Sequence, residues 1–580
     1  MRLKTPLPAA LATLAVAALP AAASAHETRP GAPVGERALR AYETRILGPE
    51  HAAEHAAARR LVRISAHDRR WRRPDQSRSG PASQVGRWTT KPFRIPTFAI
   101  HAALVHTGEV MFWGYPPAVS NPRPNVGQSW LWNPRKGTTR RAMTDIPAPM
   151  MDADGDGHVE HTPLYCSGES MLPDGRILIV GGNGRWPTDA TGDDFLGLNV
   201  TYTFDPRTRR WQRQGAMRQG RWYPGQVLLP DGRTVVLGGY NESEPGGLFN
   251  TDLEVYSGGT FEYQPQGDRR TALYPHMVLM PSGKVLLAGP ARGDSGLLDP
   301  NTWTWSKVPA LTRSRVGGNM LLMPGTSAQG SQRLLNLGGY DPDEADGNDD
   351  VKATSTIEDI DFRSPNPKWQ RRRTGLHVAR SYANTVQLPD GNAVVVGGGA
   401  GKIGTKINYA VRHDHKNRRV ELLDERTGRT RLGPYQVEDR AYHSTALLLP
   451  DGRVWSAGDD ANPNNLTDTA EIYSPPYLFR GRRPRIASAP RTVRLGSRFT
   501  IRVGGTRGHR AVLMAPQAIT HGAEMNGRTV VLKTVSRGRG GRMTLGLTGN
   551  GAIAPPQYYM LFVIGDRGVP SVAKWVRVTS

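Results

Sequence analysis

Between residues 102 and 458 the sequence repeats one short unit seven times, and this repeat restricts the possible folds more than any other feature. Each copy has an apolar run, a turn of the Pro-Asp-Gly type, a β-branched run, and a glycine pair or a similar ending. An Asp-Gly turn supplies the positive φ angles that a tight two-stranded hairpin requires, so each copy predicts a β-hairpin. The copies span residues 102–114, 170–182, 226–239, 277–289, 320–339, 385–398 and 445–458.

Hairpins that recur about every 40–67 residues have the spacing of propeller blades. We therefore expect an all-β protein with a seven-bladed, kelch-type β-propeller over residues 95–482. The repeat then stops, and residues 483–580 hold alternating strand runs typical of a separate Ig-like β-sandwich. Residues 26–94 form a basic N-terminal segment, in which 35–65 show helical spacing, so a short helical region is expected there.

The first 25 residues have the features of a secretory signal peptide. Arg2 and Lys4 precede an apolar run over residues 7–22, and the small residues Ala23-Ser24-Ala25 follow it. The run is short and interrupted by prolines, and no later stretch approaches the roughly 18 apolar residues of a membrane-spanning helix. We expect a mature chain that begins at His26, is secreted or associated with the cell envelope, and has no transmembrane segment.

The formal net charge is +24, with 75 Lys and Arg against 51 Asp and Glu. Such a charge favours anionic partners, of which nucleic acids and acidic polymers of the cell envelope are the main classes. The basic residues are scattered, and no helix-turn-helix, zinc-finger or RNA-binding pattern accompanies them. Nucleic-acid binding is therefore not predicted, and anionic envelope polymers remain as possible partners.

The chain has a single cysteine, Cys166, which excludes an intrachain disulfide framework and thiolate metal clusters. A spare thiol is oxidised outside the cell, so an unpaired cysteine in an exported protein needs an explanation. Counting eight residues back from the first turn residue of each hairpin places five residues at one equivalent position: Cys166, Tyr223, Tyr274, Tyr382 and His443.

Equivalent positions at the start of the inner strands of a propeller converge on the central channel at one face. The count therefore predicts that a cysteine, several tyrosines and a histidine face one axis, with Tyr442 beside His443. The alternative is that aromatic residues at this position merely fill the mouth of the channel. That alternative suits Tyr274 and Tyr382, but it does not account for Cys166 and the Tyr442-His443 pair.

Four motifs in this order resemble the copper radical oxidases, the family of galactose oxidase and glyoxal oxidase, and the resemblance runs from about residue 95 to the end. The motifs are Tyr-Cys-Ser-Gly (165–168), Arg-Trp-Tyr-Pro (221–224), the Arg-Ala-Tyr-His segment that opens 440–454, and Ile-Thr-His-Gly (519–522). The C-terminal segment from Pro555 is also similar to the closing domain of this family.

The resemblance implies a copper site and a role for each matching residue. His443 and His521 would be equatorial ligands, and Tyr442 would be the axial ligand. Tyr223 would be a further equatorial ligand, joined through a thioether to Cys166 and able to carry a radical. Two imidazoles, a phenolate and an open position suit Cu(II). The indole that covers the thioether in galactose oxidase has no counterpart at Gly238-Gly239-Tyr240-Asn241, so Trp186 is our first choice for it, before Trp222 and Tyr240.

The implied activity is the oxidation of primary alcohols or aldehydes by dioxygen, with hydrogen peroxide as the second product. The substrate would be a small molecule or a carbohydrate. Tyr442 would take the proton of the substrate hydroxyl as a general base, and a C–H hydrogen would pass to the Tyr223 radical. The alternative is a non-catalytic kelch-type scaffold for adhesion or the cell envelope. The retention of Cys166, Tyr442 and His521 favours the enzyme.

Two further patterns are weaker. Asp152, Asp154 and Asp156 have the carboxylate spacing of a calcium loop, although Pro163 at position 12 excludes an EF-hand, so a looser Ca²⁺ site or a solvated acidic loop is expected. His413 and His415 lie two residues apart on a basic loop, and we expect both to be exposed.

Overall fold

The computed structural model describes residues 71–116, 125–185, 195–243, 247–346, 350–403, 411–459, 467–506 and 508–580. The predicted signal peptide, the predicted helical region and Trp186 lie outside these residues. Within them the chain is built almost entirely of β-strands, with one α-helical turn, α4 (Ala82–Val85). None of the helices in these ranges is long and apolar enough to cross a membrane.

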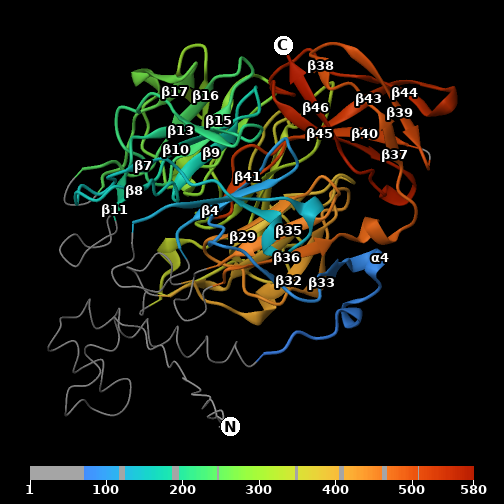
Figure 1. Cartoon of the computed structure of the whole chain (residues 1–580), viewed down its shortest axis with the longest axis horizontal. Coiled ribbons are helices and arrows are strands. Elements are labelled where there is room, and N and C mark those ends of the chain that lie inside the picture. The colour runs from blue at the N-terminus through green and yellow to red at the C-terminus, as the bar shows by residue number, and fades with distance from the viewer. Residues whose placement is uncertain are drawn as a thin grey trace, which may run out of the picture. The chain divides into compact units, whose positions relative to one another are not determined.

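The repeats form seven antiparallel sheets in the described ranges, which confirms the propeller (Figure 1). In each sheet the first strand of the hairpin lies innermost. The first four blades contain β3 (His101–Leu104), β4 (Val110–Gly114), β5 (Gln128–Trp132) and β6 (Met143–Asp145); β9 (Ser167–Met171), β10 (Ile177–Gly181), β13 (Thr201–Asp205) and β14 (Arg210–Arg213); β15 (Gly225–Leu228), β16 (Thr234–Leu237), β17 (Glu254–Ser257) and β18 (Thr260–Tyr263); and β19 (Met277–Leu279), β20 (Val285–Leu287), β21 (Gly296–Asp299) and β22 (Thr304–Ser306).

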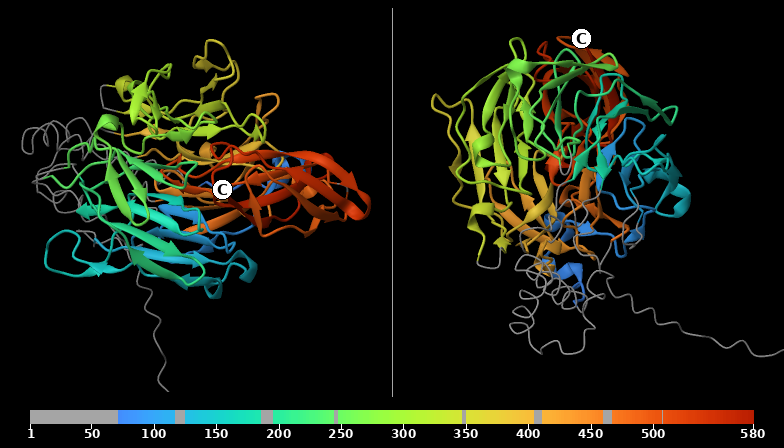
Figure 2. Two further views of the ribbon diagram at one scale, coloured as in Figure 1. Left: turned by 90° about the horizontal axis from the view of Figure 1, so that it is seen from above. Right: turned by 90° about the vertical axis from the view of Figure 1, so that its left-hand side faces the viewer.

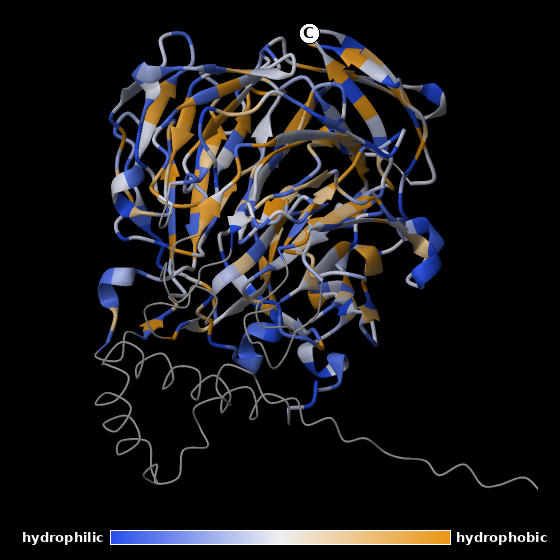
Figure 3. Cartoon of the chain, turned by 60° about the vertical axis from the view of Figure 1, so that its left-hand side comes forward, coloured by the Kyte–Doolittle hydropathy of each residue, from blue (hydrophilic) through white to orange (hydrophobic). Residues whose placement is uncertain are grey.

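The last three blades follow the same order. They contain β23 (Asn319–Leu322), β25 (Arg333–Leu337), β27 (Ile357–Asp361) and β28 (Gln370–Arg371); β29 (Ser381–Gln387), β30 (Ala393–Gly399), β32 (Arg419–Leu423) and β33 (Thr430–Tyr435); and β34 (Ser444–Leu448), β35 (Val454–Gly458), β36 (Thr469–Ser474) and β1 (Arg87–Trp88). Apolar residues concentrate along these strands, as Figure 3 shows, because both faces of a blade pack against its neighbours.

The last blade takes its outer strands from the beginning of the described chain. β1 pairs with β36 through Arg87 and Ser474, and β2 (Phe93–Arg94) pairs with the same strand. Residues 87–94, which the sequence placed in the N-terminal segment, therefore belong to the propeller and close its ring. Their hairpin partner is far away in sequence, so the repeat pattern could not reveal them.

The C-terminal residues form one curled sheet of two halves. Its strands are β37 (Arg485–Ser488), β38 (Thr492–Arg494), β39 (Arg498–Gly504), β40 (Arg510–Met514), β43 (Thr529–Gly538), β44 (Arg542–Gly546), β45 (Tyr558–Ile564) and β46 (Lys574–Thr579). The long strand β43 pairs with β44 along one part and with β40 along the other, with a register shift between Thr534 and Ser536. The expected sandwich thus has two layers joined through one strand, around an apolar core that includes Ile501 and Leu561.

A hairpin from this domain enters the propeller. β41 (Ala518–Thr520) and β42 (Ala523–Glu524) pair with each other, and β41 also pairs with β3, the innermost strand of the first blade. In that pairing His101 lies opposite Thr520 and Ala103 opposite Ala518. The two further views in Figure 2 show the C-terminal domain, in red, beside the blades of the propeller. The turn of the hairpin, at residues 521–522, consequently lies at the channel axis.

Three glycine pairs of the repeat join neighbouring blades. In the second blade the Gly182 N–H donates to the Arg221 carbonyl of the third blade at 3.0 Å, and a Cβ on Gly181 would lie 2.1 Å from the same oxygen. Gly339 and Gly398 make the same bond to Arg380 and Arg440. Glycine is needed here because a side chain would collide with the next blade's backbone.

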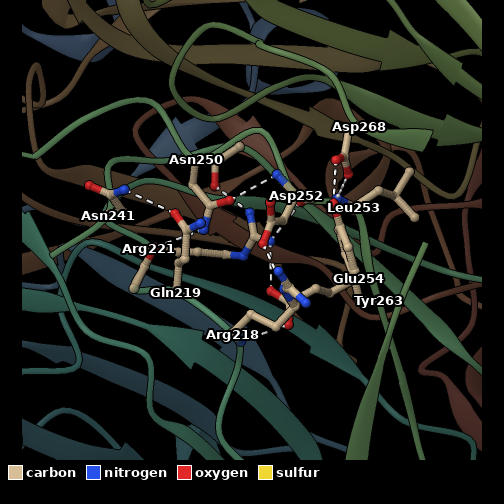
Figure 4. Close-up of polar contacts among 12 residues, drawn as sticks. Arg218, Gln219, Arg221, Asn241, Asn250, Asp252, Leu253, Glu254, Tyr263 and Asp268 are labelled. Carbon is tan, nitrogen blue, oxygen red and sulfur yellow. Dashed lines mark hydrogen bonds and ion pairs between the residues drawn. The ribbon is translucent and has the colours of Figure 1, made fainter. Parts of the chain in front are cut away.

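The arginines of these contacts are buried in ion pairs within their own blades. Arg221 donates to the Glu254 carboxylate at 2.7 Å and to the Gly238 carbonyl at 2.9 Å, in the network of Figure 4. Neither side chain of the Arg221–Glu254 pair is exposed. Three more blades repeat the arrangement with Arg315–Glu358, Arg380–Glu421 and Arg440–Glu471.

Replacement of one partner alone is expected to be severe. Arg221→Met leaves the Glu254 carboxylate buried without its cation, which costs about 3–5 kcal/mol of the free energy of unfolding. The double variant Arg221→Met/Glu254→Leu removes both charges and recovers most of that loss. Denaturant unfolding of the full chain measures both, and a single variant as stable as the double one contradicts this account.

Candidate metal centre

The five residues that the sequence count placed at one register share a rare backbone conformation. Their φ angles are 66° for Cys166, 67° for Tyr223, 48° for Tyr274, 54° for Tyr382 and 59° for His443. With His521 at 51°, they account for six of the ten non-glycine residues with positive φ in the described part of the chain. Such residues are uncommon and concentrate at functional sites, because the surrounding structure must hold them in place.

Backbone hydrogen bonds between blades explain this conformation. The Tyr223 N–H donates to the Cys166 carbonyl at 2.9 Å, and the Tyr274 N–H donates to the Tyr223 carbonyl at 2.8 Å. The Tyr382 N–H donates in the same way to Gly317 at 2.6 Å, and Gly317 also has a positive φ of 63°. The left-handed turn directs the N–H groups of these three tyrosines towards the preceding blade, so backbone hydrogen bonds join neighbouring blades beside the channel.

Three side chains converge on the hydroxyl of Tyr223. His521 Nε2 lies 2.6 Å from this oxygen and His443 Nε2 lies 3.4 Å from it, while the Tyr442 hydroxyl shares a short hydrogen bond with it. All four residues are buried. The blades supply Tyr223, Tyr442 and His443, and the turn of the β41–β42 hairpin supplies His521.

The four groups fit a bound metal ion. Two imidazole nitrogens and two phenol oxygens within one small volume form the nitrogen and oxygen set that Cu(II) prefers. The metal would also supply the positive charge that a buried phenolate needs, since burial, and then the neighbouring Tyr442, raise the pKa of Tyr223 well above its usual value. Without a metal ion the Tyr223 phenol therefore stays protonated at neutral pH.

Cys166 lies against Tyr223. Both residues belong to one buried cluster that also contains Trp222, and Cys166 is 3% exposed. Burial raises the pKa of the Cys166 thiol, and the neighbouring Tyr223 and Trp222 side chains offset this rise only in part. The structure therefore brings together the cysteine and the tyrosine that the register count aligned, at equivalent positions in adjacent blades.

Aromatic rings cover Tyr223. The Trp222 ring stacks on it with centroids 3.5 Å apart and an angle of 5° between the planes, and Phe195 stacks on Trp222 at 4.3 Å. Tyr274 stacks on Tyr223 at 4.3 Å. Trp186, our first choice for this position, is outside the described residues, whereas Trp222, a further candidate, contacts Tyr223 directly. Of the two tyrosines expected to fill the channel mouth, Tyr274 thus touches the site, and Tyr382 meets Tyr442 edge-on at 5.0 Å.

His101 and Glu169 were not predicted, yet they support the cysteine. The Cys166 N–H donates to His101 Nε2 at 2.8 Å, and His101 Nδ1 lies 3.0 Å from a Glu169 carboxylate oxygen. Both side chains are fully buried between the first two blades. Burial lowers the pKa of His101 and raises the pKa of Glu169, which favours the uncharged form of each. Their pairing depends on the ring of blades, so no local sequence signal identifies it.

The structure places the acidic residues of 152–156 close together, but it differs from the expectation for the histidines at 413 and 415. The carboxylates of Asp152, Asp154 and Asp156 are exposed and lie within 4.8 Å of one another, so a calcium ion there stays a prediction. The prediction that His413 is exposed was wrong, because it is 4% exposed and its Nε2 lies 2.9 Å from an Asp459 carboxylate oxygen. The basic character of the loop gave no sign of this acidic partner. His415 is partly buried and stacks on Trp71 at 5.6 Å.

Comparison with protein families decides the affiliation. The family model described as the glyoxal oxidase N-terminus matches residues 161–477, more than half of the chain. The galactose oxidase-like early set domain matches residues 483–578. The chain belongs to the copper radical oxidase family. Its enzymes are alcohol and aldehyde oxidases, and the four donor groups of this oxidase come from both matched regions.

Individual relatives agree with this affiliation. Galactose oxidase of Gibberella zeae is 26% identical over 504 residues, which cover 80% of this chain and 69% of that protein. Aldehyde oxidase GLOX of Vitis pseudoreticulata is 28% identical over 470 residues, which cover 72% of this chain and 82% of that protein. A solved structure of a fungal alcohol oxidase in complex with copper has the same fold, with a TM-score of 0.68 and 24% identity over 86% of this chain and all of that one.

Burial of the Cys166 thiol leads to a labelling prediction. In full-length protein purified without copper, iodoacetamide should leave Cys166 unmodified under native conditions, because the thiol is buried and protonated. The same reagent should modify it fully after unfolding in guanidinium chloride. Mass spectrometry of the peptide measures both, and rapid labelling of the native protein contradicts the buried position.

Proposed function

We propose that this chain is an exported copper oxidase that oxidises primary alcohols or aldehydes and reduces dioxygen to hydrogen peroxide. The main observation behind this proposal is that the side chains of His443, His521 and Tyr442 converge on the Tyr223 hydroxyl. Relatives named galactose oxidase and aldehyde oxidase support the substrate class, and a structural relative in complex with copper supports the metal.

Tyr223, Tyr442, His443 and His521 would hold the copper ion. When bound, copper supplies an open position for the substrate hydroxyl and accepts one electron. The chain supplies the rest of the chemistry. The Tyr442 hydroxyl, in its deprotonated form, takes the proton of the substrate hydroxyl as a general base. Tyr223, in its oxidised radical form, takes a hydrogen atom from the adjacent carbon.

The overall reaction balances. A primary alcohol loses two electrons and two protons and becomes an aldehyde, and a hydrated aldehyde likewise becomes an acid. Dioxygen accepts both electrons and both protons and becomes hydrogen peroxide. Tyr223 and Tyr442 return to their starting states, so each turnover consumes one dioxygen.

We also propose that a thioether joins Cys166 to the ring of Tyr223. The new sulfur–carbon bond replaces one S–H and one ring C–H bond, and dioxygen is the oxidant that accepts the two hydrogen atoms. The burial of Cys166 in one cluster with Tyr223, and the backbone hydrogen bond between these two residues, support this link. Sulfur on the ring lowers the potential of the Tyr223 radical, and the stacked Trp222 is proposed to shield it.

The link also explains how a lone cysteine persists outside the cell, since a thioether no longer carries a reactive thiol.

Export itself rests on the predicted signal peptide. The comparisons do not support the binding of anionic envelope polymers, which stays a prediction from the net charge. A non-catalytic scaffold is not favoured, because a scaffold has no use for four metal-binding groups buried at one point.

The activity can be tested with copper-loaded, full-length protein in a peroxidase-coupled assay on a panel of primary alcohols and aldehydes. Peroxide should form in proportion to the dioxygen consumed. Tyr442→Phe removes the proposed base and should lower kcat by about 10²–10⁴-fold. Tyr340→Phe is a matched control. Tyr340 is buried in the same cluster as Tyr442, but its hydroxyl forms a hydrogen bond with Tyr382 instead of Tyr223.

The control variant should keep most of the activity of the unmodified protein. Absence of peroxide with every substrate in the panel, or full activity of Tyr442→Phe, contradicts the proposed function.

A further inference from the structure

The hydroxyl of Thr520 lies between a backbone carbonyl and the ring of His521. It donates to the Ile100 carbonyl at 2.9 Å, and the same oxygen lies 2.6 Å from His521 Nδ1. Thr520 is fully buried, and its position is fixed by the pairing of β41 with β3.

The number of available protons settles the direction of the second bond. A threonine hydroxyl has one hydrogen to donate, whereas a carbonyl oxygen has none. The hydroxyl hydrogen of Thr520 is therefore used by Ile100, and towards His521 the oxygen can only accept. Nδ1 of His521 must consequently carry a hydrogen. In a neutral imidazole the other nitrogen, Nε2, then has a free lone pair, and Nε2 is the nitrogen that lies 2.6 Å from the Tyr223 hydroxyl.

We propose that Thr520 is a positioning residue that holds His521 in the tautomer able to bind copper through Nε2. This inference rests on the proposed function, because it assigns His521 as a ligand. A histidine without such a partner exchanges between two tautomers, and the tautomer with a hydrogen on Nε2 cannot donate that nitrogen to a metal. Residues that hydrogen-bond to the second nitrogen of a ligand typically change metal affinity by about 10–100-fold.

The other histidine has a looser version of the same arrangement. Nδ1 of His443 faces the Tyr115 hydroxyl at 3.3 Å, a longer distance than the 2.6 Å of the Thr520 contact. His443 also packs against Tyr442 with ring centroids 3.9 Å apart. His521, on a hairpin that enters from another domain, therefore depends more on its hydroxyl partner than His443 does.

The chain offers two useful comparisons for the test. Thr520→Val keeps the shape of the side chain but removes the hydroxyl, and Thr520→Ser restores it. Thr445 is a matched control, because it is equally buried and donates to the Ala99 carbonyl at 3.2 Å. Thr445→Val thus loses the same kind of hydrogen bond beside the same centre without altering Thr520 or its contact with His521.

The first measurement uses metal-free, full-length protein labelled with ¹⁵N at histidine. Long-range ¹H–¹⁵N spectra should show His521 with hydrogen on Nδ1 alone, and Thr520→Val should show both tautomers. The signal is assigned through its loss in His521→Ala. Hydrogen on Nε2 in the unmodified protein overturns the inference, whether or not any Thr520 variant folds.

The second measurement is the dissociation constant of Cu(II), titrated without dioxygen against a competing chelator. Thr520→Val should bind copper about 10–100-fold more weakly, while Thr520→Ser and Thr445→Val stay close to the unmodified protein. If His521→Ala binds copper normally, the proposed ligand set fails. If His521→Ala binds weakly but Thr520→Val binds normally, the ligand set stands and the role of Thr520 is overturned.

Discussion

The pairing of β41 with β3 is the contact on which the centre depends. The propeller alone brings three of the four donor groups to its axis, because Tyr223, Tyr442 and His443 come from its own blades. The fourth, His521, lies on a hairpin of the C-terminal domain, and backbone pairing with the innermost strand of the first blade holds that hairpin in the channel. Separation of the two domains would therefore remove one of the four donor groups without any change in the blades.

A second constraint acts around the ring. Three glycine pairs approach the backbone of the next blade's arginine so closely that no side chain fits, and each of these arginines is held inside its own blade by a buried glutamate. A few residues later in the chain, the backbone turns into the left-handed region at Tyr223, Tyr382 and His443. At Tyr223 and Tyr382 the structure tolerates this costly conformation because hydrogen bonds between blades satisfy the turned N–H groups. The architecture thus places an equivalent residue of five blades, from Cys166 to His443, beside the channel, whatever the chemistry of its side chain.

This regularity explains how much of the centre could be predicted from sequence. A count from the turn residues is enough to align Cys166, Tyr223 and His443, because the distance from turn to channel is the same in every blade. The count cannot reach His521, which is outside the repeat and was identified through its motif.

It also misses His101, whose contacts come from residues of the second blade. Thr520 lies in the same motif as His521, but its contact with the Ile100 carbonyl depends on a residue about four hundred positions earlier in the chain. The wrong prediction for His413 has the same cause, since Asp459 is distant in sequence. The closing strands at residues 87–94 were assigned to the wrong segment because their partner, β36, is almost four hundred residues further along the chain.

The central claim is that Cys166 and Tyr223 together become part of the redox centre, and peptide mass spectrometry tests it most directly. Full-length protein purified without copper would be loaded with copper in air and digested, with an aliquot kept free of copper as the control. The account predicts that the peptides containing Cys166 and Tyr223 appear as one joined species, lighter by two hydrogen atoms than their sum, in the loaded sample only. Separate peptides with a free thiol after copper loading would contradict it.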